Sequence, residues 1–98
     1  VIFNNNFLGM VRQWQQLFFD NRYSQVELKN PDFVAISKGF GIASTKVELR
    51  ENLSEALDIM FAHDGPYVLE VVVEKEDNLF PMVPSGAACS DIILEPSK

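Results

Sequence analysis

The chain has few of the residues on which disulfides, Cys/His metal sites and nucleic-acid surfaces depend. It holds one cysteine, Cys89, and one histidine, His63. A single cysteine cannot form an intrachain disulfide, and one cysteine with one histidine cannot complete a zinc site. Eight Lys and Arg residues stand against 14 Asp and Glu residues, so the formal net charge is −6 at pH 7. This balance gives no electrostatic reason to bind nucleic acid or an anionic membrane.

Length and composition favour one small globular domain. With 98 residues, of which 47% are hydrophobic, the chain can bury one core and has no room for a second. No apolar run approaches the roughly 20 residues that span a bilayer, so we expect no membrane partner. The chain opens inside an apolar run, Val1-Ile2-Phe3, without an initiator methionine or a preceding cap. We interpret it as part of a longer protein.

The front of the chain predicts a strand end followed by a helix. Val1 to Phe3 is short, apolar and partly β-branched, which is typical of the end of a buried strand. From about Leu8 to Phe19 apolar residues recur at helical spacing and predict a helix with one apolar stripe. The stripe consists of Met10, Val11, Trp14, Leu17 and Phe18.

The middle of the chain alternates helical and extended patterns. Asn30-Pro31-Asp32 predicts a turn and a helix start, and Gly39 with Gly41 ends that helix. Residues 42–49 favour a short strand. Asn52, with Glu55 three residues later, resembles a capping box ahead of a second helical stripe.

The last third predicts one more strand and a tail. Tyr67 to Val73 is a nearly continuous apolar run that only Glu70 interrupts, as in a parallel strand covered on both faces. For residues 78–98, which include Pro81, Pro84 and Gly86, we expect an ordered loop. Strands that alternate with helices indicate βαβ units with right-handed crossovers. The predicted fold is a three-layer α/β/α structure with a mainly parallel sheet, truncated at its N-terminal side.

Three sequence blocks in a fixed order resemble a known enzyme family. The blocks are Asn4-Asn5 with Leu8-Gly9-Met10-Val11 and Gln13-Trp14 at the front, Arg22-Tyr23-Ser24 and Asn30-Pro31-Asp32-Phe33 in the middle, and Pro81-Met82-Val83-Pro84-Ser85-Gly86 near the end. Together they resemble the catalytic subunit of acetolactate synthase (acetohydroxyacid synthase), a thiamine-diphosphate enzyme of branched-chain amino-acid synthesis. The likeness covers nearly the whole chain. It implies that residues 1–98 are the C-terminal half of a thiamine-diphosphate-binding domain.

The resemblance implies an activity, cofactors and partners. Such an enzyme decarboxylates pyruvate on thiamine diphosphate and joins the two-carbon unit to pyruvate or 2-ketobutyrate. The resemblance also implies Mg²⁺ on the diphosphate, FAD bound by another domain, a homodimer or homotetramer, and a small regulatory subunit. We expect a cytoplasmic enzyme in a bacterium and an organellar one in a eukaryote. No catalytic residue is assigned to this chain, which is expected to be inactive alone.

The asparagine run is the predicted metal site. Asn4 to Asn6 follow a strand, and open α/β sheets bind ligands at the carboxyl ends of their strands. In the family a motif that begins Gly-Asp-Gly and ends Asn-Asn holds the metal. By this likeness Asn5 gives its side-chain oxygen to Mg²⁺ and Phe7 its backbone carbonyl, while Gly9 contacts the cofactor. Such hard oxygen ligands suit Mg²⁺. The Gly-Asp-Gly half is absent from this sequence.

A structural interpretation of the same asparagines stays open, because Asn is also suited to caps and turns. The resemblance places Met10 near both the cofactor and a substrate and inhibitor pocket, which Val11, Trp14 and Ser85 complete. Trp14 would otherwise be a core residue and Ser85 part of a solvated turn.

Two rival functions remain at this point. One is a different thiamine-diphosphate carboligase or decarboxylase of the same fold, against which Gln13-Trp14 argues. The other is a non-catalytic α/β interaction module whose asparagines are only caps. His63 at a helix end and the isolated Cys89 are assigned no chemistry.

Overall fold

The computed structural model describes residues 1–95, and their contacts divide the chain into two compact units. The sheet unit combines Val1–Phe7 with Leu28–Lys75, and the α1 unit combines Leu8–Glu27 with the residues from Glu76 onward. Length alone predicts one domain with one core. A cluster of buried apolar side chains lies in the sheet unit. In the α1 unit, polar side-chain bonds join α1 to Asn78 and Leu79, and sequence patterns do not reveal them.

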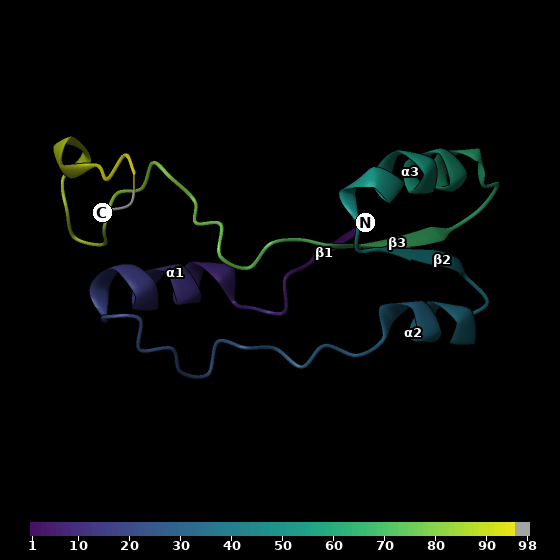
Figure 1. Cartoon of the computed structure of the whole chain (residues 1–98), viewed down its shortest axis with the longest axis horizontal. Helices are drawn as coiled ribbons and strands as arrows, with labels where there is room; N and C mark the ends of the chain where they lie inside the picture. The colour runs from purple at the N-terminus through teal and green to yellow at the C-terminus, as the bar shows by residue number, and fades with distance from the viewer. Residues whose placement is uncertain (96–98) are drawn as a thin grey trace. The chain divides into compact units, whose positions relative to one another are not determined.

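The sheet unit contains a parallel sheet of three strands, as predicted (Figure 1). These are β1 (Ile2–Asn4), β2 (Ala43–Val47) and β3 (Tyr67–Val72), in the order β1-β3-β2. Both neighbours of β3 run parallel to it, and Asn4 lies opposite Val72 in the register. The central strand is therefore the one that the sequence marks by its nearly continuous apolar run.

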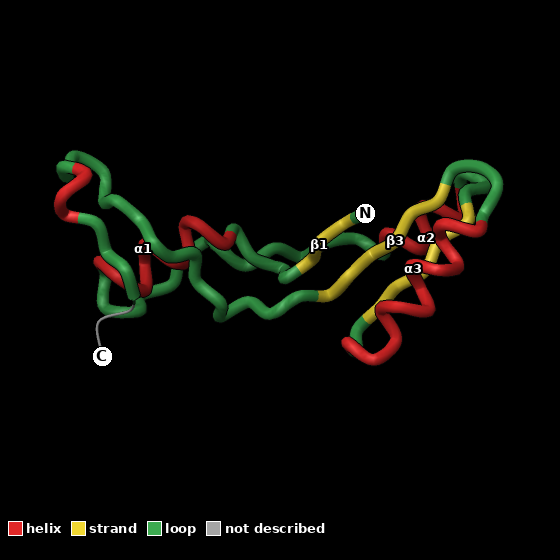
Figure 2. The backbone as a smooth tube through the Cα atoms, turned by 90° about the horizontal axis from the view of Figure 1, so that it is seen from above, coloured by secondary structure: helices red, strands yellow, loops and turns green. Residues whose placement is uncertain are grey.

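Two helices cover opposite faces of the sheet, which confirms the three-layer arrangement. Figure 1 shows α3 (Leu53–Ala62) on one side of β2 and β3, and α2 (Phe33–Gly39) on the other. In Figure 2 both helices lie at the β3 and β2 side of the sheet. The buried core under α3 consists of Val47, Ala56, Leu69 and Val71.

The two helix starts differ, and one prediction is wrong. Asp32 caps α2 by accepting a hydrogen bond from the N–H of Ala35 at 2.9 Å. The predicted capping box at Asn52 does not form: within residues 1–95, the Asn52 side chain makes no capping bond to α3. A short 3-10 helix, η1 (Arg50–Asn52), leads directly into α3, and Asn52 N–H donates to the carbonyl of Leu49 at 3.0 Å. Because the chain enters α3 already in a helical conformation, no side-chain cap is needed.

The α1 unit contains α1 (Gly9–Phe18) and a 3-10 helix, η2 (Cys89–Asp91). The buried residues of α1 are polar, namely Arg12 and Gln13, and its apolar stripe is largely exposed. In the predicted loop, the described residues include η2 and an antiparallel bridge between Met82 and Ile93. Its last residues, 96–98, lie outside the described part of the chain. Each helix in residues 1–95 is too short or too polar to cross a membrane.

Candidate functional site

A tight turn follows β1, and we call residues Asn4 to Phe7 the asparagine turn. The side-chain oxygen of Asn5 accepts a hydrogen bond from the N–H of Phe7 at 3.0 Å. Asn6 adopts φ 57°, a left-handed conformation in which Asn is enriched. Its carbonyl accepts a hydrogen bond from the N–H of Leu28 at 2.7 Å. The turn interpretation of the asparagines is therefore correct, and the helix-cap interpretation is wrong, because the N-cap residue of α1 is Leu8.

Buried polar side chains lie directly behind the asparagine turn. Glu70 in β3 is 3% exposed and Asn4 is 8% exposed. The Asn4 amide nitrogen donates to a carboxylate oxygen of Glu70 at 2.7 Å. The Asn4 amide oxygen accepts from the side-chain nitrogen of Asn30 at 2.8 Å and from the N–H of Asn6 at 3.0 Å. Every buried side-chain nitrogen and oxygen in the described part of the chain has such a partner.

A polar hollow of about 720 Å³ opens on the α2 face of the sheet. Its lining includes Asn4, Asn30, Lys46, Glu48 and Glu70. Lys46 Nζ lies 3.1 Å from a carboxylate oxygen of Glu48. The hydrogen bond and negative charge of Glu48, with a smaller contribution from Glu70, raise the pKa of Lys46 above its usual value of 10.5. The lysine is therefore cationic throughout the physiological pH range.

Trp14 and Ser85 line one hollow in the α1 unit, although they are far apart in the sequence. This hollow has a volume of about 420 Å³, and we call it the Trp14 hollow. Its lining consists of Trp14, Phe18, Phe19, Pro84 and Ser85. A second hollow of about 440 Å³ is lined in part by Val11 and Trp14. Among the described residues, Met10 lines neither of these hollows. Trp14 is 44% exposed, so it is not a core residue of the described chain.

Ser85 lies in a tight turn at the edge of the Trp14 hollow. The N–H of Ala87 donates to the carbonyl of Pro84 at 3.0 Å, and Gly86 has φ 82°. A positive φ at the third residue is typical of a type II turn, which favours glycine there. Ser85 is exposed at the second position of this turn. The solvated-turn interpretation thus agrees with the structure and is compatible with a place at a pocket mouth.

The comparisons with known proteins identify the family. Residues 1–71 match the family model described as thiamine pyrophosphate enzyme, C-terminal TPP binding domain. The chain belongs to this family. Its cofactor, thiamine pyrophosphate, is the compound also called thiamine diphosphate.

Relatives of this chain are acetolactate synthases. The large subunit of acetolactate synthase isozyme 2 from Escherichia coli is 45% identical over 94 residues, which cover 95% of the chain and 17% of that protein. The mitochondrial acetolactate synthase of Schizosaccharomyces pombe is 40% identical over 97 residues, covering 99% of the chain and 14% of that protein. A probable chloroplastic acetolactate synthase 2 of Oryza sativa subsp. japonica is 38% identical over 105 residues, covering 97% of the chain and 16% of that protein. The chain spans between 14% and 17% of the length of these relatives.

The asparagine turn has the donor chemistry that a magnesium ion requires. An amide oxygen has two acceptor lone pairs, and the Asn5 oxygen uses one for the N–H of Phe7. The second lone pair and the backbone carbonyl of Phe7 are hard, neutral oxygen donors, which suit Mg²⁺. Residues 1–95 contain no group of three His, Cys, Asp or Glu side chains that could hold a metal. The turn therefore fits as a contributor of two ligands in a site completed from elsewhere.

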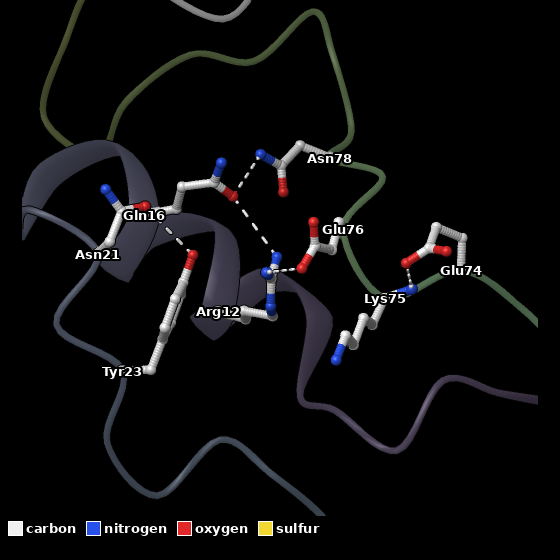
Figure 3. A network of polar contacts seen from close by, with 8 residues as sticks. All are labelled: Arg12, Gln16, Asn21, Tyr23, Glu74, Lys75, Glu76 and Asn78. Atoms are coloured by element: carbon white, nitrogen blue, oxygen red, sulfur yellow. Dashed lines mark hydrogen bonds and ion pairs between the residues drawn. The ribbon is translucent and has the colours of Figure 1, made fainter.

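Polar contacts join α1 to Tyr23 and to the residues from Glu76 onward. Arg12 lies 4.8 Å from the ring centroid of Tyr23 and 3.6 Å from a carboxylate oxygen of Glu76. Gln16 accepts a hydrogen bond from the side chain of Asn78 at 2.9 Å. Figure 3 shows Arg12, Gln16, Glu76 and Asn78 linked in one polar network beside α1. The contacts to Glu76 and Asn78 hold α1, which carries Trp14, against the residues from Glu76 onward.

The sequence pattern does not identify Glu70 and its partners, because Glu70 stands out in it only as an interruption of an apolar run. A usable signal was present, because a charged residue in the middle of a buried strand needs a hydrogen-bonding partner. That signal does not name the partner. The partner is Asn4, which lies 66 residues earlier in the sequence.

Proposed function

We propose that the full-length protein to which this chain belongs is an acetolactate synthase. It decarboxylates pyruvate and joins the two-carbon product to pyruvate or 2-ketobutyrate. The observation that carries this proposal is the 45% identity to the Escherichia coli enzyme over 95% of the chain. Thiamine diphosphate, when bound, supplies the electron sink for decarboxylation, and the protein supplies position and electrostatics. The shared acetolactate synthase name of the relatives favours this activity over another reaction on the same cofactor.

The metal role is proposed for two oxygens of the asparagine turn. The side-chain oxygen of Asn5 and the backbone carbonyl of Phe7 would hold Mg²⁺, which would supply positive charge for the cofactor diphosphate. The support is the turn itself, in which the Asn5 oxygen is oriented by the N–H of Phe7. Gly9, the first residue of α1, and Met10 contact the cofactor in this proposal.

A substrate role is proposed for four residues of the α1 unit, two of which line the Trp14 hollow. Met10, Val11, Trp14 and Ser85 form the wall of the pocket that receives the second 2-keto acid. The support is that Trp14 and Ser85 line the same hollow and that Trp14 is half-exposed. A half-exposed indole can contact a small apolar group of a substrate, which a core indole cannot.

The partners of the proposed enzyme lie outside this chain. The rest of the catalytic subunit supplies the acidic metal ligand, another domain binds FAD, and the subunits form a homodimer or homotetramer with a small regulatory subunit. Residues 1–98 form the C-terminal half of the cofactor-binding domain, with residues 78–98 as its tail. The enzyme is cytoplasmic in a bacterial source and organellar in a eukaryotic one; the mitochondrial and chloroplastic relatives support the organellar half of this proposal.

The test is acetolactate formation by the purified full-length protein. Pyruvate with thiamine diphosphate and Mg²⁺ should give acetolactate, and a chelator should stop the reaction. Asn5→Ala should lower the activity by more than about 10-fold, because even outer partners of metal ligands cost 10- to 100-fold. Asn52→Ala is the matched control, since this exposed asparagine forms no cap within the described chain. Equal activity of the two variants, or a product other than acetolactate, would contradict the proposal.

The chain by itself should not bind the cofactor. It supplies two neutral metal ligands, whereas the acidic ligand and the thiamine site lie elsewhere in the proposed enzyme. Calorimetric titration of residues 1–98 with thiamine diphosphate and Mg²⁺ should therefore give no measurable heat of binding. A micromolar dissociation constant would contradict this expectation.

A further inference from the structure

Glu70 is a buried carboxylate on a strand that otherwise reads as apolar. It is 3% exposed, and its neighbours Leu69 and Val71 belong to the core on the opposite face of the sheet. Burying a carboxylate is costly unless it accepts hydrogen bonds. An apolar side chain would fill this position without that cost. The contacts of Glu70 therefore indicate a role other than filling space.

Glu70 fixes the orientation of the Asn4 side chain. Its carboxylate accepts a hydrogen bond from the Asn4 amide nitrogen at 2.7 Å. A flipped amide would place the Asn4 oxygen against the carboxylate, where neither group could donate. The Asn4 oxygen must therefore point toward the asparagine turn. There it accepts from the side chain of Asn30 at 2.8 Å and from the N–H of Asn6 at 3.0 Å.

The oriented Asn4 oxygen holds the backbone of the turn at Asn6. One side of Asn6 is fixed by this bond to its N–H, and the other by the N–H of Leu28, which donates to the Asn6 carbonyl at 2.7 Å. These bonds keep Asn6 at φ 57°, a conformation that is uncommon for residues with a side chain. Asn5 and Phe7 are the chain neighbours of Asn6. The same bonds therefore fix the position of the Asn5 side-chain oxygen relative to the Phe7 carbonyl.

We propose that Glu70 and Asn30 are positioning residues for the metal-binding turn. Acting through Asn4, they hold the Asn5 side-chain oxygen and the Phe7 carbonyl in one arrangement before the metal ion arrives. The inference rests on the proposed function, in which these two oxygens bind Mg²⁺. Ligands that are oriented by such outer bonds bind a metal ion more tightly than mobile ones.

The experiment measures Mg²⁺ affinity in the full-length protein by calorimetric titration at saturating thiamine diphosphate. Glu70→Leu, which removes the acceptor for Asn4, should weaken Mg²⁺ binding about 10- to 100-fold. Glu70→Gln keeps an acceptor oxygen and should stay within about threefold of wild type, because the bond to Asn4 persists. Asn30→Ala removes a donor at an exposed site and should weaken binding by about 10-fold.

The control is Val71→Ala, which loosens the core on the other face of β3 and leaves Asn4 untouched. It should lower the melting temperature and leave Mg²⁺ affinity within about twofold of wild type, because cavity formation alone does not reorient the turn. Wild-type affinity in Glu70→Leu, an equal loss in Glu70→Gln, or a loss in Val71→Ala as large as in Glu70→Leu would each overturn the proposal. If Glu70→Leu fails to fold, Asn30→Ala decides: weakened binding supports the proposal and unchanged binding overturns it.

Asn5→Ala separates this inference from the function on which it rests. Loss of Mg²⁺ binding in Asn5→Ala, together with unchanged binding in Glu70→Leu, overturns the positioning role alone. Unchanged binding in Asn5→Ala overturns the metal assignment itself, and the positioning role with it.

Discussion

Gln13 and Gln15 make the same pair of hydrogen bonds in different surroundings, so comparing them measures what burial adds. Gln13 Nε2 donates to the carbonyl of Leu79 at 2.8 Å, and its Oε1 accepts from the N–H of Leu79 at 2.9 Å. Gln15 makes the matching bonds to Ser24, at 3.0 and 3.1 Å, but these are exposed. Gln13 is 2% exposed. We expect Gln13→Leu to destabilise the protein much more than Gln15→Leu.

The difference in unfolding free energy between the two variants depends on the backbone groups that lose their hydrogen-bonding partners. Leucine has nearly the volume and helix propensity of glutamine, so α1 itself should be little affected. In Gln13→Leu the Leu79 N–H and carbonyl lose their partners in a part-buried site, and each such loss costs about 1–3 kcal/mol. The Leu79 side chain is largely exposed, and water reaches part of this site. We therefore expect a total loss of about 2–3 kcal/mol. At Gln15 water replaces both bonds, and the loss should stay below about 1 kcal/mol.

Trp14 provides the assay, because it is the only tryptophan of the chain and lies in α1 between the two glutamines. Urea unfolding of each variant, followed by tryptophan fluorescence, gives the free energy of unfolding of this part of the chain. Amide hydrogen exchange at Leu79 should rise in Gln13→Leu and stay unchanged in Gln15→Leu. Losses that agree within about 0.5 kcal/mol, or a larger loss for Gln15→Leu, would refute the reasoning from burial.

Three further predictions concern single residues. The side-chain amine of Lys46 should titrate above 10.5 by NMR, and Glu48→Gln should lower its pKa. Because the pKa is raised by folding, the stabilisation from this pair is present below pH 10.5 and is lost as the pH rises through the higher folded value; unchanged titration in Glu48→Gln would disprove the assigned cause. Gly86→Ala places a side chain at φ 82° and should cost about 1 kcal/mol in urea unfolding, and a neutral effect would contradict the strained turn. In the full-length enzyme, Trp14→Leu should reduce the preference for 2-ketobutyrate over pyruvate by roughly 10- to 200-fold, with pyruvate turnover within about tenfold; a variant that melts early but keeps its preference would remove Trp14 from the substrate pocket.

Local patterns were sufficient for helix α1 and for the elements and layers of the sheet unit. Helical spacing predicted α1 from Leu8 to Phe19, close to the observed Gly9–Phe18. The continuous apolar run at Tyr67 predicted the central parallel strand. These features depend on neighbouring residues, whose spacing is visible in the sequence. The capping box at Asn52 failed because the preceding 3-10 turn, which the local pattern did not reveal, starts α3 without a cap.

Burial in α1 could not be predicted from its periodicity. The pattern locates an apolar stripe but does not say which side of the helix has a partner. The buried side carries Arg12 and Gln13, whose partners Glu76 and Leu79 lie more than 60 residues further along the chain. The candidate site likewise has one part that the sequence predicts and one part that it does not. The asparagine turn could be predicted from residue type, whereas the pairing of Asn4 with Glu70 depends on the sheet register.

The distance along the chain between Asn4 and Glu70 has a consequence for the order of folding. A peptide of residues 1–20 contains the three asparagines of the asparagine turn. It lacks Glu70, Asn30 and Leu28, which hold the turn in place. Contacts between residues far apart in the sequence form late, because closing the intervening loop costs chain entropy. The turn should therefore acquire its final shape only when β3 docks against β1, as one of the last steps of folding. In a nascent chain the three asparagines of the turn would be synthesised long before the turn adopts its folded conformation.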